Sequence, residues 1–145
     1  PLSFEMTFLL TSKFLKAAAV SVVVFILLDY LWLAVIASKW YRQTLGHLAE
    51  LDGEGKIIFN IPMGLIAQVV LSLCISFVVG LALQLDQRWV VAMGVGAFTG
   101  FCLYAVYDFT NLSFVKNYPL WIALLDVAWG TFQGLLGGIY FHKLY

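Results

Sequence analysis

The sequence carries little charge for its length. Only 11% of its 145 residues are Asp, Glu, Lys or Arg, whereas 63% are hydrophobic and the mean hydropathy is +0.95. A soluble domain keeps roughly a quarter of its residues charged, so this composition indicates an integral membrane protein. The formal net charge is zero and the basic residues are scattered. This pattern excludes a nucleic-acid partner, which needs a clustered basic face.

Residues that hold metals and cofactors are scarce as well. Cys74 and Cys102 have no C-x-x-C spacing, and His47 and His142 lie outside the apolar runs. These features argue against a zinc site and against a haem with axial histidines. No lysine lies inside an apolar run, so a Schiff base with retinal is excluded too. We therefore expect no cofactor and no metal.

Four apolar runs are long enough to cross a bilayer, which takes roughly 20 residues. They predict helices at about 17–38, 60–85, 89–109 and 119–141. The fold class expected is all-α, a polytopic integral membrane four-helix bundle that forms a single transmembrane domain over residues 1–145. Leucines recur at helical spacing in the first connection, which predicts a short interfacial helix at about 43–52.

An even number of crossings places both termini on one side of the membrane. Lys and Arg are divided evenly between the two sides, with Lys13, Lys16, Arg88 and Lys143 on the terminal side and Lys39, Arg42, Lys56 and Lys116 on the other. Under the positive-inside rule, the orientation then depends only on the extra weight given to the first helix. That weight places the termini in the cytoplasm.

Three aspartates lie in the predicted spans, in the half of the membrane away from the termini. Asp29 lies ten residues before the Lys39 end of its span and Asp126 seven residues after Pro119, and Asp108 closes the third span. A carboxylate at the centre of a span costs roughly 2.5–3.5 kcal/mol on insertion scales. No Lys, Arg or His in the spans neutralises them. They therefore hold protons, bond neighbouring helices, or meet a ligand that supplies positive charge.

Polar and aromatic residues accompany these acids in the same half. The candidate ligand- or ion-binding set is Asp29, Asp126, Asp108, Asn111, Gln68, Asn60, Trp32, Trp129 and Tyr107. Glycines at four-residue spacing predict close helix packing, because they let helix backbones approach each other. These packing residues are Gly130, Gly134 and Gly138 in the last span, with Gly96 and Gly100 in the third.

Three motifs carry a family resemblance: "DYLWL" from Asp29, "YDFTN" from Tyr107 and "DVAWG" from Asp126. They are similar to the D-x-x-W-L, Y-D-x-T-N and D-x-x-W-G motifs of a bacterial domain-of-unknown-function family of small four-helix membrane proteins. One departure is Tyr118, where that family places tryptophan before the proline. The resemblance implies a bacterial inner-membrane location and no particular activity.

Three functions remain open at this point. The first is binding or translocation of a proton, cation or small polar or amine solute at the acids, a version that predicts a homo-oligomer. The second is a membrane enzyme that uses Asp as acid or base on a lipid or isoprenoid. The third is an accessory subunit whose glycine faces dock to partner helices. We favour the first, with the lipid bilayer as surroundings and a solute, ion or lipid as ligand, and therefore lean away from an enzyme.

Overall fold

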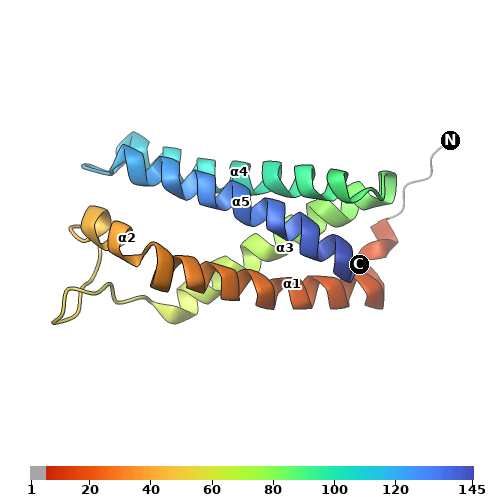
Figure 1. Cartoon of the computed structure of the whole chain (residues 1–145), viewed down its shortest axis with the longest axis horizontal. Coiled ribbons are helices and arrows are strands. Elements are labelled where there is room, and N and C mark those ends of the chain that lie inside the picture. The colour runs from red at the N-terminus through yellow and green to blue at the C-terminus, as the bar shows by residue number, and fades with distance from the viewer. Residues whose placement is uncertain (1–5) are drawn as a thin grey trace.

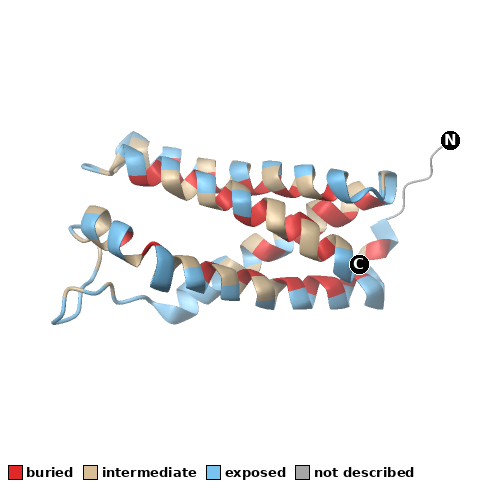
Figure 2. Cartoon of the chain, viewed as in Figure 1, coloured by how far each residue is buried: buried red, intermediate tan, exposed pale blue. Residues whose placement is uncertain are grey.

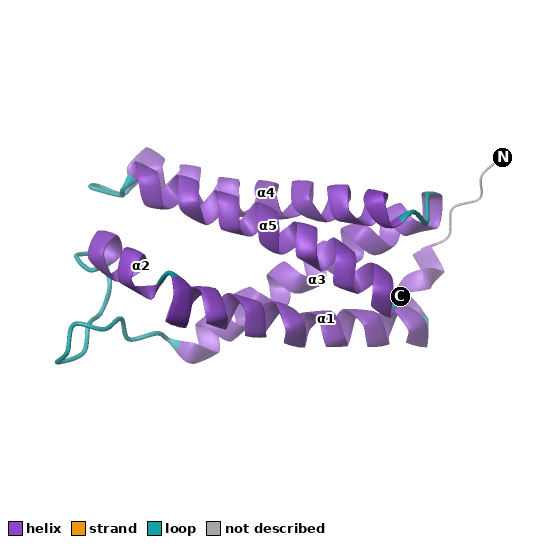
Figure 3. Ribbon diagram, viewed as in Figure 1, coloured by secondary structure: helices purple, strands orange, loops and turns teal. Residues whose placement is uncertain are grey.

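The computed structural model describes residues 6–145, and helices make up most of that range. In chain order they are the 3-10 helix η1 (Met6–Leu10), α1 (Ser12–Tyr30), the π-helix η2 (Leu31–Ile36), α2 (Ser38–Leu45), α3 (Ile61–Leu85), α4 (Trp89–Phe114) and α5 (Leu120–Leu144). Four spans result: α1 with η2, α3, α4 and α5. The predicted all-α membrane bundle is confirmed. Figure 3 shows the longest connection, residues 46–60, as a loop after α2.

Helices α4 and α5 run side by side, α1 runs opposite that pair, and α3 crosses between them (Figure 1). The first and last spans meet at one end, where the Lys13 ammonium lies 4.3 Å from the centre of the Tyr145 ring. We call this the terminal end. The opposite end, which carries α2 and the loop after it, is the α2 end.

Local signals explain where the helices start. Thr11 caps α1 by accepting a hydrogen bond from the Phe14 N–H at 3.2 Å, so α1 begins at Ser12, five residues before the predicted start. Asn60 caps α3 in the same way, through the Met63 N–H at 3.3 Å. The third and last spans run farther than predicted, to Phe114 and Leu144.

The short helix of the first connection lies earlier than expected. It occupies Ser38–Leu45 rather than about 43–52, and a turn follows it. A bridge between Leu51 and Ile57 then closes a tight turn in which Gly55 has φ +78°. Glycine takes this left-handed backbone without the penalty of a Cβ. The local turn therefore replaces the second half of the predicted helix.

The two ends are packed differently. At the terminal end, buried aromatic and aliphatic side chains from all four spans form one apolar cluster, with Phe25 and Phe141 fully buried. In α3, the buried residues begin only at Ser72, so its first half stands outward, as the pale blue ribbon in Figure 2 shows. The α2 end therefore leaves room between the helices.

Glycines set the spacing of α4 and α5. A Cβ added at Gly96 would meet the Gly134 carbonyl oxygen, and one at Gly100 would meet the Gly130 carbonyl oxygen. A Cβ at Gly138 would meet the carbonyl of Ala92. The two backbones therefore touch directly, which is the close approach that small residues permit in membranes.

Candidate functional site

A cavity of about 610 Å³ lies among the helices in the half toward the α2 end. Each span contributes a polar residue to its wall: Asp29 from α1, Gln68 from α3, Tyr104 from α4 and Asp126 from α5. We call this the acid cavity. Its full lining is Asp29, Leu33, Tyr41, Leu45, Ala67, Gln68, Val70, Leu71, Leu103, Tyr104, Tyr107, Tyr118, Ile122 and Asp126. Within residues 6–145, no basic side chain forms part of this wall.

The two D-x-x-W segments exchange hydrogen bonds between helices. Trp129 on α5 donates from Nε1 to the Asp29 carboxylate on α1 at 2.9 Å. In the other direction, Trp32 donates from Nε1 to the Tyr41 hydroxyl at 3.1 Å, and Tyr41 donates to Asp126 Oδ1 at 2.7 Å. Trp129 therefore bonds the aspartate of the other motif directly, and Trp32 is linked to the aspartate of the other motif through Tyr41.

The two indole rings that make this exchange also stack on each other. Trp32 and Trp129 lie 4.5 Å apart between ring centroids, at an angle of 5°. Trp32 lies in the wider turn of the π-helix η2, where its carbonyl accepts a hydrogen bond from the Ala37 N–H at 2.7 Å. Such wider turns are found preferentially at functional sites. The stack fixes the donors that hold Asp29 and, through Tyr41, Asp126.

Asp108 lies next to this cavity but not on its wall. The prediction that it closes the third span is wrong, because α4 continues to Phe114 and Asp108 is fully buried. Its Oδ1 accepts a hydrogen bond from the Tyr118 hydroxyl at 2.9 Å, and its Oδ2 has no hydrogen-bond partner. The carboxyl of Asp126 lies beside it, and Asp126 in turn interacts with Asp29. Three acids therefore form one chain of neighbours.

The donors in contact with these acids are neutral groups. Burial, and next to it the charge of Asp126, raises the pKa of the Tyr41 hydroxyl far above its usual range. Burial also raises the pKa of Tyr118. Both tyrosines therefore remain protonated donors at any physiological pH. They hold the carboxyl oxygens in place without neutralising them.

Gln68 supplies a further acceptor. It lines the acid cavity and its side chain lies near Asp29. Its Oε1 is buried without a hydrogen-bond partner. A buried acceptor left unpaired costs about 1–3 kcal/mol. The wall therefore has spare acceptors on Gln68 and on the carboxyl groups, and a shortage of donors.

The remaining candidates are placed unequally. Tyr107 lines the acid cavity, although its side chain is mostly exposed to the outside. Asn111 lies near the Tyr107 and Tyr118 side chains without lining the cavity. Asn60 is exposed, caps α3, and takes no part in the cavity wall.

Sequence reasoning missed three tyrosines of this cavity: Tyr41, Tyr104 and Tyr118. Tyr41 and Tyr118 were not among the predicted site residues, because both lie just outside the predicted spans. The sequence signal for Tyr104 is its four-residue spacing from Gly100 and Asp108, and in the structure a Cβ at Gly130 would collide with the Tyr104 ring. A buried tyrosine usually finds a partner for its hydroxyl, but its sequence position does not identify that partner.

Within the described part of the chain, no group of three or more His, Cys, Asp or Glu side chains is placed to hold a metal ion. Searches of the curated proteins and of the solved structures gave no match. A family model described as "Predicted membrane protein (DUF2177)" matches residues 14–140, a range that includes the three motif acids Asp29, Asp108 and Asp126. The chain belongs to this family of membrane proteins.

Proposed function

We propose that the protein binds a cationic solute with N–H donors, an amine, in the acid cavity, and that protons occupy the acids when the amine is absent. The observation that carries this proposal is the imbalance of the wall. Asp29, Asp126 and Gln68 present acceptor oxygens, and the donors that residues 6–145 offer to the two acids are neutral. A protonated amine supplies both the missing donors and the missing positive charge.

The rest of the wall indicates the shape of such a solute. Apart from the acids, Gln68 and the tyrosines, the lining consists of Leu, Ile, Val and Ala side chains. An amine with an apolar part places its charge at the carboxyl groups and its carbon chain against this surface. Binding in this form releases the proton that an acid held before, so amine uptake and proton release are linked.

The experiment uses octylamine as the probe, with octanol and octanoate as matched probes of the same chain length. Purified protein in detergent is titrated while the fluorescence of its tryptophans is recorded, because the Trp32–Trp129 stack bonds to the acids. Octylamine is expected to bind and the other two are not. Charged hydrogen bonds contribute about 1.5–3 kcal/mol, so Asp29→Asn and Asp126→Asn should each weaken binding roughly tenfold or more.

Asp86→Asn is the matched control, since Asp86 is an acid outside the acid cavity, in the α3–α4 turn. It should bind octylamine like the unmodified protein. Equal affinity for octylamine and octanol would sink the proposal, and so would full binding in the Asp29→Asn, Asp126→Asn double variant. Near-ultraviolet circular dichroism of the stacked indoles confirms that each variant is folded.

A second candidate function has one specific observation in its favour. The Tyr41 hydroxyl and the Asp126 carboxylate form a short donor–acceptor pair against an apolar wall. Such a pair suits general acid–base catalysis on a lipid or isoprenoid. Incubation with a membrane lipid extract tests it: a product that forms with the unmodified protein and not with Asp126→Asn supports catalysis.

For topology, we propose a bacterial inner-membrane protein with its terminal end in the cytoplasm. Support comes from Lys13 and Lys16 at the start of the first span, which weighs most in the positive-inside rule. Lys143→Cys and Lys116→Cys, each in a Cys74→Ser, Cys102→Ser background, report the two ends. In intact cells an impermeant thiol reagent should label the second and not the first, and the reverse pattern contradicts the proposal.

A further inference from the structure

A second cavity, of about 430 Å³, lies at the α2 end on the other side of Tyr41. We call it the basic cavity. It shares Leu33, Tyr41 and Leu45 with the acid cavity, so these residues separate the two. Its lining is Leu33, Ala34, Ser38, Tyr41, Arg42, Leu45, Ala49, Lys56, Ile57 and Phe59.

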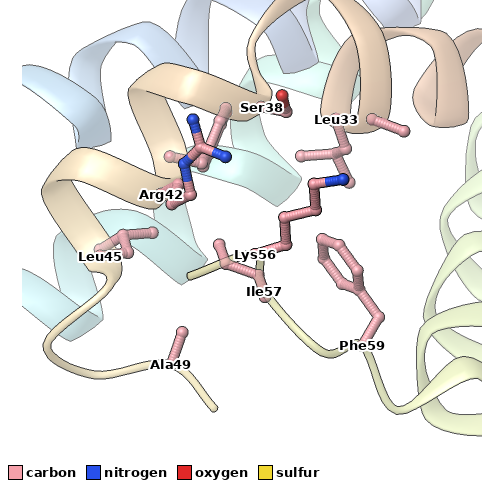
Figure 4. Close-up of a pocket in the computed structure, with 10 residues that line it drawn as sticks. Leu33, Ser38, Arg42, Leu45, Ala49, Lys56, Ile57 and Phe59 are labelled. Carbon is pink, nitrogen blue, oxygen red and sulfur yellow. The ribbon is translucent and has the colours of Figure 1, made fainter. Parts of the chain in front are cut away.

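The charged residues on this wall are Arg42 and Lys56. Figure 4 shows Arg42 extending from α2 and Lys56 from the loop before α3, with the Ser38 hydroxyl above them and Phe59 below. Asp52 and Glu54, the acids of the loop that carries Lys56, do not line the cavity. Glu54 pairs with Lys56 at 3.4 Å on the exposed side of the loop. The cavity wall therefore carries two basic side chains and no acid, and one of the two, Lys56, also pairs with Glu54.

The loop fixes the position of Lys56. Asp52 accepts hydrogen bonds through Oδ1 from the backbone N–H groups of Glu54 and Lys56, at 2.8 and 2.9 Å. The Asp52 N–H donates to the Lys56 carbonyl at 2.8 Å. These bonds hold the pKa of the Asp52 carboxyl below its usual range, so the turn keeps its charge and its shape near neutral pH. Lys56 is therefore presented on a closed turn.

The position of the cavity at the end of the first span favours a ligand that comes from the membrane. Leu33 and Ala34 belong to the last turn of the first span, which ends at Ile36, and Arg42 lies in the helix directly after it. This level corresponds to the lipid head groups. Arginine forms bidentate bonds to phosphate, and lysine attracts it as a point charge. The apolar remainder of the wall suits the glycerol and first acyl carbons.

We propose that the basic cavity binds the phosphate-bearing head group of an anionic membrane lipid through Arg42 and Lys56. The Ser38 hydroxyl donates a further hydrogen bond to the phosphate. This site goes beyond the proposed amine binding and does not depend on it, because the charged residues of the two cavities differ. Tyr41 lines both cavities, so it lies between the proposed phosphate site and the proposed amine site.

The test compares lipids on the purified full chain. Protein in a zwitterionic detergent receives phosphatidylglycerol, phosphatidylcholine or inorganic phosphate, and retained lipid is measured by native mass spectrometry alongside the melting temperature. Phosphatidylglycerol is expected to be retained and to raise the melting temperature. Because bonds to a charged group are strong, the Arg42→Gln, Lys56→Gln double variant should lose about tenfold or more in affinity.

Two matched variants make the result specific. Lys39→Gln removes the same charge from the same helix at a residue outside the basic cavity, and should bind phosphatidylglycerol normally. Lys56→Arg keeps the charge and should also bind. Asp126→Asn should retain the lipid while it loses octylamine, which separates this site from the acid cavity.

Three outcomes overturn the proposal. The first is full retention of phosphatidylglycerol in the double variant. The second is an equal loss in Lys39→Gln, which indicates general surface charge and no built site. The third is equal protection by inorganic phosphate at millimolar concentration, which indicates a soluble phosphate compound as ligand.

Discussion

The α4–α5 pair and the α1–α3 side of the bundle are packed in opposite ways. Along α4 and α5, Gly96, Gly100, Gly134 and Gly138 let the two backbones touch directly. On the other side, α3 has no fully buried residue before Ser72, and α1 continues directly after Asp29 and Tyr30 as the π-helix η2. The α4–α5 pair is closely packed, and the looser packing of α1, α2 and α3 against it leaves the space that the two cavities occupy.

This difference explains how a chain of four spans encloses a polar site. Lipid tails are as apolar as leucine, so helices in a membrane associate through close packing and hydrogen bonds. On the α4–α5 side, the glycine contact supplies the close packing. On the other side, the bonds from Trp129 to Asp29 and from Tyr41 to Asp126 tie α1 and α2 to α5 across the cavity. The polar groups therefore act both as the proposed binding site and as the attachment of the looser side.

The largest expected effect comes from adding one methyl group to the glycine contact. In Gly134→Ala the new Cβ meets the Gly96 carbonyl and the Gly100 Cα, which are backbone atoms that cannot rotate away. Overpacking costs about 1–3 kcal/mol and occasionally more, and we expect about 3 kcal/mol here because the helices have to separate. Thermal or denaturant unfolding in detergent measures the loss.

The same substitution on the looser side is the control. A Cβ at Gly64 on α3, or at Gly94 on the outer face of α4, meets nothing within 4 Å. Alanine there should leave stability unchanged or raise it by up to about 1 kcal/mol, through helix propensity. Equal losses at Gly134 and Gly64 would remove the distinction between the two sides.

A smaller effect is expected from truncating one phenylalanine at each end. Phe141 is fully buried at the terminal end and packs edge-on against Phe14 at 5.8 Å between ring centroids. Phe→Ala in a core costs about 3–5 kcal/mol in water, and we expect about 2 kcal/mol here because lipid also solvates the exposed ring in the unfolded state.

Phe59→Ala is the matched substitution at the α2 end. Phe59 is 52% exposed and lines a cavity that already exists, so its removal creates little new void. We expect a loss of less than about 0.5 kcal/mol, as for a surface position. A comparable loss at both positions contradicts the view that the α2 end is loosely packed.

The four spans could be predicted because apolar length is a local property of the sequence. Asp29 and Asp126 are identified by their surroundings in the chain alone. Their donors are not, because Trp129 bonds an aspartate 100 residues away and Tyr41 one 85 residues away. Such pairings depend on how α1 and α5 face each other, and helical spacing within one segment does not contain that information.

Some predicted helix boundaries were wrong for a related reason. The predicted end of the third span at 109 followed the loss of apolar residues at Asp108, Thr110 and Asn111. In the structure Asp108 is bonded to Tyr118, so a polar residue continues the helix where an isolated segment would have ended. The short helix was misplaced because Asp52 closes a turn through its own backbone bonds, which competes with the helix.

The smallest expected effect concerns two exposed acids at opposite ends of the bundle. At the terminal end, the Arg88 side chain bonds Asp86 through Nε at 3.0 Å and through its terminal nitrogen at 2.7 Å. These bonds hold the pKa of Asp86 below its usual value of 3.8. At the α2 end the pKa of Asp52 is also lowered, chiefly by backbone N–H groups of Lys56 and Glu54. Removal of a cation should therefore affect the two acids unequally.

Arg88→Gln should return the pKa of Asp86 toward 3.8, whereas Lys56→Gln should leave the pKa of Asp52 low, because its donors belong to the main chain. Both pKa values are depressed by folding, so each carboxylate contributes stability above pH 3.8 that is lost as pH falls through the lower value of the folded state. Carbon-detected NMR titration of the carboxyl groups measures both. If the pKa of Asp86 stays low in Arg88→Gln, the prediction is contradicted. The backbone N–H of residue 88, which donates to Asp86 Oδ1 at 3.0 Å, then holds this pKa down, as backbone N–H groups do for Asp52.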